Sequence, residues 1–246
     1  MLSTSTRLNL PTVLVLAIAI VGLAMLVATG PAYRLGYWGI GSIVSVLRWA
    51  AYIGIAAMAL STLVAISRFR KDRHGLGMCV LAFAIGIFNF GMPYSLQRQA
   101  FTLPPIHDIT TDIENPPTFV DVVSLRSDAP NTLDYDPSVG VVQQNAYPDL
   151  KSLILDITLS DAFDLALKTA RNEGWEIVSS NKTLGLIEAT DVTFWYGFKD
   201  DVVIRLVSHQ IGSKIDVRSV SRVGLGDLGA NALRIRSFLS NLLESS

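Results

Sequence analysis

The sequence predicts an α+β protein, in which an N-terminal anchor of three transmembrane helices precedes an antiparallel β-sheet domain with helices packed on one face. The first observation is charge: the first 100 residues hold eight of the 20 lysines and arginines but only one of the 21 acidic residues. The net charge of −1 therefore combines a basic part with an acidic part, as expected for a membrane part and an aqueous part. The other observations are three long apolar runs and a series of short β-rich runs.

Three apolar runs cover residues 12–30, 49–67 and 76–94, and none contains a charged residue. Each is close to the roughly 20 residues that a helix needs to cross the hydrocarbon of a bilayer. We therefore expect a transmembrane anchor over residues 1–97. The segment 37–49 before the second run contains Arg48 and three aromatic residues, and it is interpreted as an interfacial or re-entrant piece at headgroup level.

The most basic loop sets the expected orientation. It covers residues 68–74, between the second and third runs, and positive loops stay in the cytoplasm. Because Arg7 precedes the first run, that run could be a cleaved signal peptide, but its length and the two further runs favour an uncleaved span. We expect a multi-pass protein of the bacterial inner (cell) membrane, with a cytoplasmic N-terminus and a periplasmic domain after Tyr94.

The runs lack the charged side chains that ion pathways and proton relays require, so a transporter or channel is not expected. Asn89 in the third run is expected to make a hydrogen bond between helices. The acidic second part argues against nucleic acid as a partner, because nucleic-acid binding needs a basic surface. The lipid bilayer is the partner that the apolar runs themselves predict.

The second part divides into a proline-rich arm over residues 98–150 and a regular α+β domain over residues 151–246. Seven of the ten prolines lie in the arm, which predicts irregular structure that could wrap over the following domain. In the domain, an amphipathic helix is expected between a cap at Ser160 and a terminating Gly174. Five β-rich runs follow, at residues 175–180, 183–191, 192–198, 201–208 and 214–221. A last amphipathic helix is expected over residues 227–243.

Before the last helix, Gly224, Gly226 and Gly229 spell the G-x-G-x-x-G pattern of dinucleotide sites. Such a site needs a parallel βαβ unit and a later acidic residue, but only 17 residues follow Gly229. Asp227 would also repel a pyrophosphate and occupy the helix amides that should bind it. We therefore expect a turn with Asp227 as the helix cap, no bound dinucleotide and no cofactor.

Period-two alternation places Arg205, Arg218, Arg222 and Asp216 on the sheet face away from the helices. Two interpretations stay open. The three arginines could bind a phosphate or carboxylate, for example in an anionic lipid headgroup. They could instead form a ladder of ion pairs across the strands with Asp200, Asp201 and Asp216, and acidic residues of the arm would pack against it.

The stretch I-H-D-I-T-T-D contains the candidate catalytic residues His107, Asp108 and Asp112. A histidine beside carboxylates can bind a divalent metal or act as a general base. These side chains can equally organise turns through hydrogen bonds to the backbone. Since the other histidines are remote in sequence and no known hydrolase motif is present, no metal site is expected and an enzymatic function is the less favoured reading.

Three motifs carry a resemblance to the bacterial and chloroplast family DUF1499 (domain of unknown function 1499). They are E-A-T at residues 188–190, F-x-D-D-V at 198–202 and R-S-x-S-R-x-G-x-x-D-L-G-x-N at 218–231. The resemblance covers residues 101–243 and, with three spans and I-H-D-I-T-T-D, fits a membrane-anchored subgroup. Many members open the domain with a cysteine-containing stretch that this chain lacks, so no role tied to those cysteines is implied. The family implies no biochemical activity.

Together these observations lead us to expect a membrane protein whose outer domain binds or interacts, in assembly or maintenance of the cell envelope. Its partner would be a periplasmic or membrane protein or an anionic lipid headgroup. One alternative is a membrane-anchored hydrolase that uses His107 with Asp108 or Asp112. Another is a purely structural subunit of a membrane complex.

Overall fold

The computed structural model describes residues 9–71 and 73–246. The chain divides into two compact units, Met1–Gln99 and Ala100–Ser246, each with its own hydrophobic core. The first unit is built from helices that come one after another along the chain. The second unit is built around a β-sheet.

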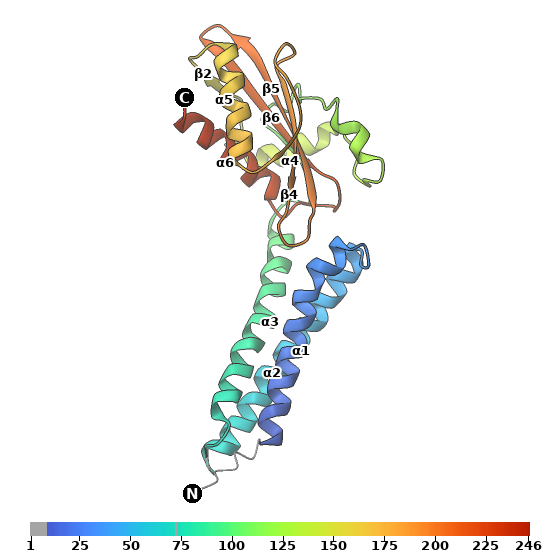
Figure 1. The fold of residues 1–246 in the computed structure, drawn as a ribbon, viewed down its shortest axis with the longest axis vertical. Helices are drawn as coiled ribbons and strands as arrows, with labels where there is room; N and C mark the ends of the chain where they lie inside the picture. The colour runs from blue at the N-terminus through green and yellow to red at the C-terminus, as the bar shows by residue number, and fades with distance from the viewer. Residues whose placement is uncertain (1–8, 72) are drawn as a thin grey trace, which may run out of the picture. The chain divides into compact units, whose positions relative to one another are not determined.

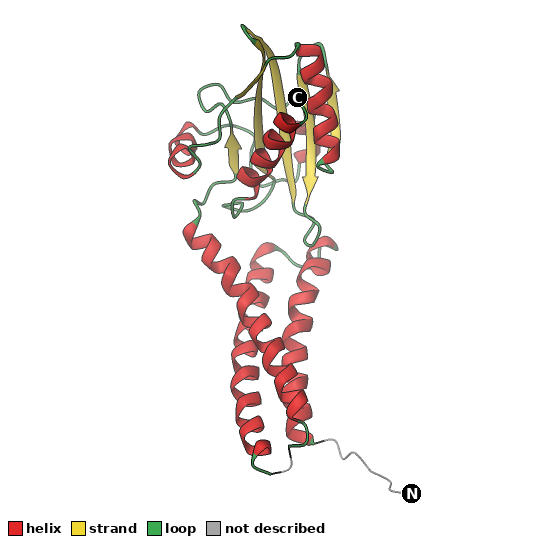
Figure 2. Ribbon diagram, turned by 90° about the vertical axis from the view of Figure 1, so that its left-hand side faces the viewer, coloured by secondary structure: helices red, strands yellow, loops and turns green. Residues whose placement is uncertain are grey.

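The first unit contains three helices, α1 (Leu10–Arg34), α2 (Ile40–Phe69) and α3 (Leu76–Thr102), drawn in red in Figure 2. All three are long and apolar enough to cross a membrane, and they contain the three predicted spans. The expected interfacial or re-entrant piece at residues 37–49 is wrong, because most of it forms the first turns of α2. No proline interrupts this stretch, and Arg48 is tolerated because a long basic side chain can reach the interface while its helix continues.

Small residues allow the helices of the first unit to pack closely. A Cβ atom added to Gly54 would lie 2.7 Å from the carbonyl oxygen of Gly86, so the α2 and α3 backbones meet there without side chains between them. The Asn89 side-chain amide of α3 donates to the carbonyl oxygen of Ala19 in α1 at 2.9 Å. This is the predicted hydrogen bond between helices, and it satisfies the N–H side of the buried amide, whose Oδ1 atom has no hydrogen-bond partner among the described residues.

The second unit contains an antiparallel six-stranded sheet with the strand order β1-β6-β5-β4-β3, and β2 also pairs with β6. Helices α5 (Leu159–Asn172) and α6 (Ala230–Glu244) pack on one face of the sheet, as Figure 1 shows, which confirms the predicted fold class. The strands are β1 (Asp108–Thr110), β2 (Leu153–Leu155), β3 (Glu176–Asn181), β4 (Leu186–Val192), β5 (Lys199–His209) and β6 (Gly212–Ser221).

Alternation along the central strands builds the core between the sheet and these two helices. Ile204 of β5 and its register partner Val217 of β6 are fully buried there, together with Phe238 of α6. The ring of Trp175 stacks on Phe238 with centroids 5.2 Å apart. Because successive side chains of a strand point to opposite faces, the neighbouring residues of β5 and β6 are directed to the second face.

The ends of α5 and α6 differ in detail from the sequence prediction. The cap of α5 is Thr158 rather than Ser160, because the Thr158 hydroxyl accepts the N–H of Asp161 at 3.2 Å. Gly174 follows the helix with φ of +83°, a left-handed conformation that glycine adopts without strain. Helix α6 begins three residues later than predicted, at Ala230.

The aromatic run at residues 192–198 was predicted to be a strand, and this is wrong. Val192 ends β4, and residues 193–198 form the turn between β4 and β5. The N–H of Thr193 donates to the carbonyl oxygen of Phe198 at 2.9 Å, and Gly197 has φ of +72°. A glycine in this conformation reverses the chain and outweighs the β propensity of the aromatic residues around it.

The proline-rich arm holds only short elements: β1, the 3-10 helix η1 (Val122–Arg126) and α4 (Pro137–Ala146). Gln143 of α4 ties the arm to the edge of the sheet, since its side chain donates to the carbonyl oxygen of Thr110 at 2.6 Å and accepts the Thr110 N–H at 2.9 Å. Phe119 and Val122 pack against Val203 and Val220 of the sheet. The arm therefore covers the second face.

Candidate functional site

The second face carries a network of buried charged side chains, and Arg218 of β6 lies at its centre. Its Nε and Nη2 atoms donate to the two carboxylate oxygens of Asp108 at 2.9 and 2.7 Å, the paired geometry that suits guanidinium and carboxylate best. The same guanidinium donates to the carbonyl oxygens of Pro117 and Leu133 in the arm. Arg218 therefore holds the arm to the sheet.

Aromatic rings complete the surroundings of Arg218. Its guanidinium carbon lies 5.5 Å from the ring centroid of Phe119 and 5.3 Å from that of Tyr135, both in the arm. The residue is only 2% exposed. An external anion would have to displace Asp108 and arm residues before it could bind this arginine, which favours the ion-pair interpretation at this position.

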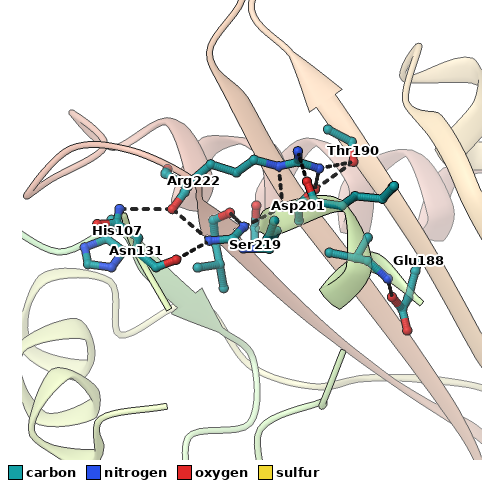
Figure 3. A network of polar contacts seen from close by, with 12 residues as sticks. His107, Asn131, Glu188, Thr190, Asp201, Ser219 and Arg222 are labelled. Carbon is teal, nitrogen blue, oxygen red and sulfur yellow. Dashed lines mark hydrogen bonds and ion pairs between the residues drawn. The ribbon is translucent and has the colours of Figure 1, made fainter. Parts of the chain in front are cut away.

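Asp201 of β5 is the centre of a second cluster, shown in Figure 3 with Arg222 pointing toward it. Arg222 donates to both Asp201 oxygens at 2.9 Å, and the Thr190 hydroxyl donates to one of them at 2.6 Å. Arg126 of η1 also pairs with Asp201, and its Nη2 donates to the carbonyl oxygen of Asn131 at 2.9 Å. One fully buried carboxylate thus joins the arm, β4, β5 and the end of β6.

Burial alone would raise the pKa of Asp201, but hydrogen bonds from Arg222, Thr190 and Arg126 outweigh it and hold the pKa below the ordinary aspartate value. Asp201 is therefore ionised at neutral pH. The adjacent arginines balance its charge, so the Asp201 carboxylate is not available as a general base.

Glu188 of β4 fixes the start of η1. Its carboxylate accepts the backbone N–H groups of Val120, Asp121 and Val122 at 2.6, 3.2 and 2.8 Å. These are the amides that lack a partner at the start of a helix. An internal carboxylate, and not an external anion, occupies this group of donors.

A third group lies toward the far end of β5 and β6. Arg205 donates to Asp112 at 3.0 Å and to Asp216 at 2.8 Å, and the Lys214 ammonium lies 2.9 Å from the same Asp112 oxygen. Burial would raise the pKa of Asp112, but the hydrogen bonds from Lys214 and from the Asn115 N–H lower it below the ordinary value. The group has two positive and two negative side chains, so it is electrically balanced.

The three catalytic candidates from the sequence lie in different surroundings. The His107 Nδ1 atom lies 3.3 Å from the carbonyl oxygen of Leu225, whereas Asp108 pairs with Arg218 and Asp112 with Arg205. Over residues 9–71 and 73–246, no group of three or more histidine, cysteine, aspartate or glutamate side chains could hold a metal ion. Both carboxylates already serve as partners of basic residues, which is the arrangement of a structural role.

Sequence reasoning named Asp201 beside the arginines but missed Arg126 and Glu188, which contribute as much to the network as the predicted arginines. A signal for Arg126 existed, because it is the only lysine or arginine in residues 101–150, surrounded by acidic residues. No sequence signal marked Glu188, since its three partners are backbone amides of a segment 66 to 68 residues away.

Another polar cluster connects α6 to the sheet. Arg234 donates to Asp191 at 2.8 Å and to Asp200 at 2.6 Å, and the fully buried Asn231 receives the Ser219 hydroxyl at 2.6 Å. The side-chain amide of Asn231 also donates to the carbonyl oxygen of His107 at 3.0 Å. Residues of the motif R-S-x-S-R-x-G-x-x-D-L-G-x-N therefore make internal contacts between β6, the start of α6 and the segment before β1.

The glycine-rich turn before α6 is arranged as a cap. The Asp227 carboxylate accepts the N–H groups of Gly229 and Asn231 at 2.8 and 2.7 Å, so it occupies amides that a pyrophosphate would need. Burial raises the pKa of Asp227 above the ordinary aspartate value, although these amides oppose the rise. The N-cap itself is Gly229, with φ of +82°, so the prediction of Asp227 as the N-cap residue is wrong by two positions, although its carboxylate does accept N–H groups at the start of the helix.

An open cleft of about 460 Å³ lies beside the buried network, between the arm and the sheet. Arg126 and Arg218 contribute to its floor, and Phe119, Val123 and Leu133 give it apolar walls. Val120 and Leu125 of the arm lie next to Val123 along the chain and are exposed. The remaining lining residues are Thr118, Ala129, Asn131, Thr132 and Asp134.

Comparison with known proteins gives one family. The model of the family described as "Protein of unknown function (DUF1499)" matches residues 108–242, which begin at β1 and end within α6. No curated protein and no solved structure matches the chain. The match covers more than half of the chain, including the arm, the sheet and the buried network. The chain therefore belongs to the DUF1499 family.

Proposed function

We propose that this protein is a membrane-anchored binding module, whose domain holds a partner protein at the periplasmic side of a bacterial inner membrane during assembly or maintenance of the envelope. One observation carries the proposal: the charged side chains of the second face are paired with one another, whereas the cleft next to them is open. Such a surface supports recognition without a chemical step.

The charge balance of the network favours a protein partner over an anionic lipid headgroup. Around the centre of the face, three arginines (Arg126, Arg218 and Arg222) meet three carboxylates (Asp108, Glu188 and Asp201), so no positive charge is left in excess. An anion would have to compete with carboxylates that are already in place and desolvated, which is costly for buried pairs.

The cleft itself has the mixed lining that a protein segment needs. Phe119, Val123 and Leu133 offer apolar contact, while Asn131 and Asp134 offer polar groups at the same surface. Apolar anchors surrounded by polar groups are the usual composition of a protein interface. A hydrolase is less well supported, because Asp108 and Asp112 are committed to Arg218 and Arg205.

The proposal can be tested by placing a photo-crosslinking amino acid at Val123 in the full-length protein in its own membranes. Val141 on α4 is the matched control, because it is also a valine, is also more than half exposed and does not line the cleft. We expect illumination to attach one defined protein at position 123 and none at position 141.

Three results would contradict the proposal. Equal attachment at both positions would mean non-specific proximity, and attachment of lipid alone would replace the protein partner with a membrane surface. No attachment at position 123 in a correctly folded protein would remove the cleft as a binding site.

A further inference from the structure

Two loops at one end of the second unit present large apolar side chains to the outside. The turn after β4 carries Phe194 and Trp195, and the loop after β6 carries Leu225 and Leu228; we call these four residues the apolar tip. Phe194 and Leu225 are each 88% exposed, and Trp195 and Leu228 are also exposed. Exposed aromatic and leucine side chains gathered on neighbouring loops mark an interaction surface more often than isolated ones do.

Backbone contacts place the two loops together. The end of β4 pairs with the start of β5, with Val192 opposite Lys199, and the N–H of Arg222 donates to the carbonyl oxygen of Lys199 at 3.0 Å. Both loops therefore leave the sheet at the same end. The other end carries the β3–β4 turn with the exposed Leu184.

The same end is where the chain enters the domain from α3. Helix α3 ends at Thr102, and only four residues later the carbonyl oxygen of Ile106 accepts the N–H of Asp227 at 3.2 Å. A Cβ atom added to Gly226 would lie 3.1 Å from Pro105, so the loop after β6 rests directly on this entry segment. The loop after β6 therefore contacts the segment that directly follows α3 in the chain.

The backbone of the second loop is itself strained at an apolar residue. Leu228 has φ of +54°, a left-handed conformation that glycine or asparagine adopts more easily. The Asp227 carboxylate holds the loop in place through the N–H groups of Gly229 and Asn231.

We propose that the apolar tip lies in the headgroup layer of the membrane, where Phe194, Trp195, Leu225 and Leu228 contact lipid and fix the domain against the bilayer surface. The expected apolar run of α3 ends at Tyr94, and the eight residues from there to Thr102 rise about 12 Å along a helix. Only this short helical segment separates the apolar run from the start of the domain in the chain.

The composition of the tip also indicates how it would bind. Residues 192–198 and 223–229 contain no lysine or arginine, and their one acidic residue, Asp227, is used as a cap. The exposed Lys199 directly follows the first loop, but the four residues of the tip carry no charge, so we expect the contact to rest on apolar and aromatic side chains, which favour the interface of any bilayer. The proposal is independent of the cleft and goes beyond the proposed partner binding.

The test uses full-length protein reconstituted alone into phosphatidylcholine vesicles. Cys79, the only cysteine, is replaced by alanine, and one new cysteine is introduced for an environment-sensitive fluorophore, as Leu225→Cys or as the matched control Leu184→Cys. Leu184 is also a leucine, is 62% exposed and lies at the opposite end of the sheet. Lipids carrying a spin label near the headgroup then serve as quenchers.

We expect a blue-shifted emission at position 225 and quenching several-fold stronger than at position 184, unchanged when anionic phosphatidylglycerol is added. Equal quenching at both positions overturns the proposal. So does a blue shift at position 225 without lipid quenching, because it would mean burial against a second copy of the chain. If Leu225→Cys disturbs folding, Phe194→Cys provides an independent measurement. A solvent-like signal at position 194 also overturns the proposal.

Discussion

At the scale of the residue, Arg218 shows how an arginine on a strand is used in this domain. Alternation along β6 directs the Arg218 side chain to the face of the sheet opposite α5 and α6. On that face it could have been exposed to solvent and bound an anion. Instead the two carboxylate oxygens of Asp108 pair with Nε and Nη2 along one edge of its guanidinium, and carbonyl oxygens of the arm accept further hydrogen bonds. Breaking such a pair leaves one buried charge without a partner, which costs more than the pair contributes.

Replacing Arg218 by methionine should therefore lower the free energy of unfolding by about 3–5 kcal/mol, because Asp108 stays behind as an uncompensated buried carboxylate. Adding Asp108→Asn to Arg218→Met should restore part of this loss. Denaturant unfolding of the full-length protein in detergent measures both variants. The more exposed Arg205→Met is the control and should cost less, and a neutral Arg218→Met would refute the structural role.

Asp201 should make the stability of the domain depend on pH in the acid range. Its pKa is lower in the folded protein than in an unfolded chain, so its contribution is complete above the ordinary carboxyl pKa of about 4 and is lost as the pH falls through the folded value. Asp112 acts in the same direction, whereas the raised pKa of Asp227 opposes it.

The variant Asp201→Asn should consequently be less stable at neutral pH, and its unfolding midpoint should change less with pH than that of the wild type below pH of about 4. Chemical unfolding repeated across this range measures the difference. The same acid dependence in both proteins would mean that the Asp201 carboxylate is not the group that the arginines stabilise.

Among the elements, the proline-rich arm is the one whose contacts are clear in the structure but were least predictable from the sequence. Residues 103–135 form almost no regular structure, yet carbonyl oxygens and amides of the arm satisfy Arg218, Arg222 and Glu188 of the sheet. Hydrophobic contact of Phe119 and Val122 with the sheet accompanies these polar contacts. The arm is therefore held largely through its backbone groups, whose partners cannot be read from a pattern of side chains.

Detachment of the arm can be measured with trypsin, because Arg126 is the only lysine or arginine in residues 101–150 and is buried. Glu188→Gln removes the charge that holds three amides at the start of η1, which should cost about 1–3 kcal/mol. Cleavage after Arg126 should therefore become faster. The exposed Glu176→Gln is the control and should leave the rate unchanged, and equal rates in both variants would contradict the role of Glu188.

Sequence patterns predicted the elements that depend on periodicity. The three apolar helices, the sheet and both covering helices have clear periods or lengths, and all are present. Local interactions explain the failures: Gly197 turned an aromatic run into a loop, and Thr158 rather than Ser160 accepts the Asp161 N–H in the first turn of α5. The polar network could be predicted only in part, because Arg126 and Glu188 bind partners far away in sequence.

At the scale of the whole molecule, charge and hydropathy separate two units with different surroundings. The first unit buries small residues and exposes large apolar ones along helices long enough to cross a membrane. The second unit keeps its apolar side chains mainly between the sheet and α5 and α6, and pairs its charges on the other face. The two units therefore differ in composition and in how they bury their apolar side chains, and each has its own core.

The basic loop at residues 68–74 predicts which side the domain occupies. A reporter that is active only in the periplasm should work when fused after Ser246, and a reporter active only in the cytoplasm should not. Fusion of both reporters within residues 68–74 serves as the reciprocal control. A stable fusion after Ser246 without periplasmic activity would contradict the expected orientation.

The central claim is that the domain holds a partner through its cleft, and native mass spectrometry of the full-length protein, extracted gently from its own membrane, tests it most directly. We expect an added mass that leaves only on activation and corresponds to one protein. It should be lost in Thr132→Trp, which fills the cleft, and kept in Gln144→Trp on the exposed side of α4. A bare polypeptide mass, or an added mass that survives Thr132→Trp, would contradict the claim.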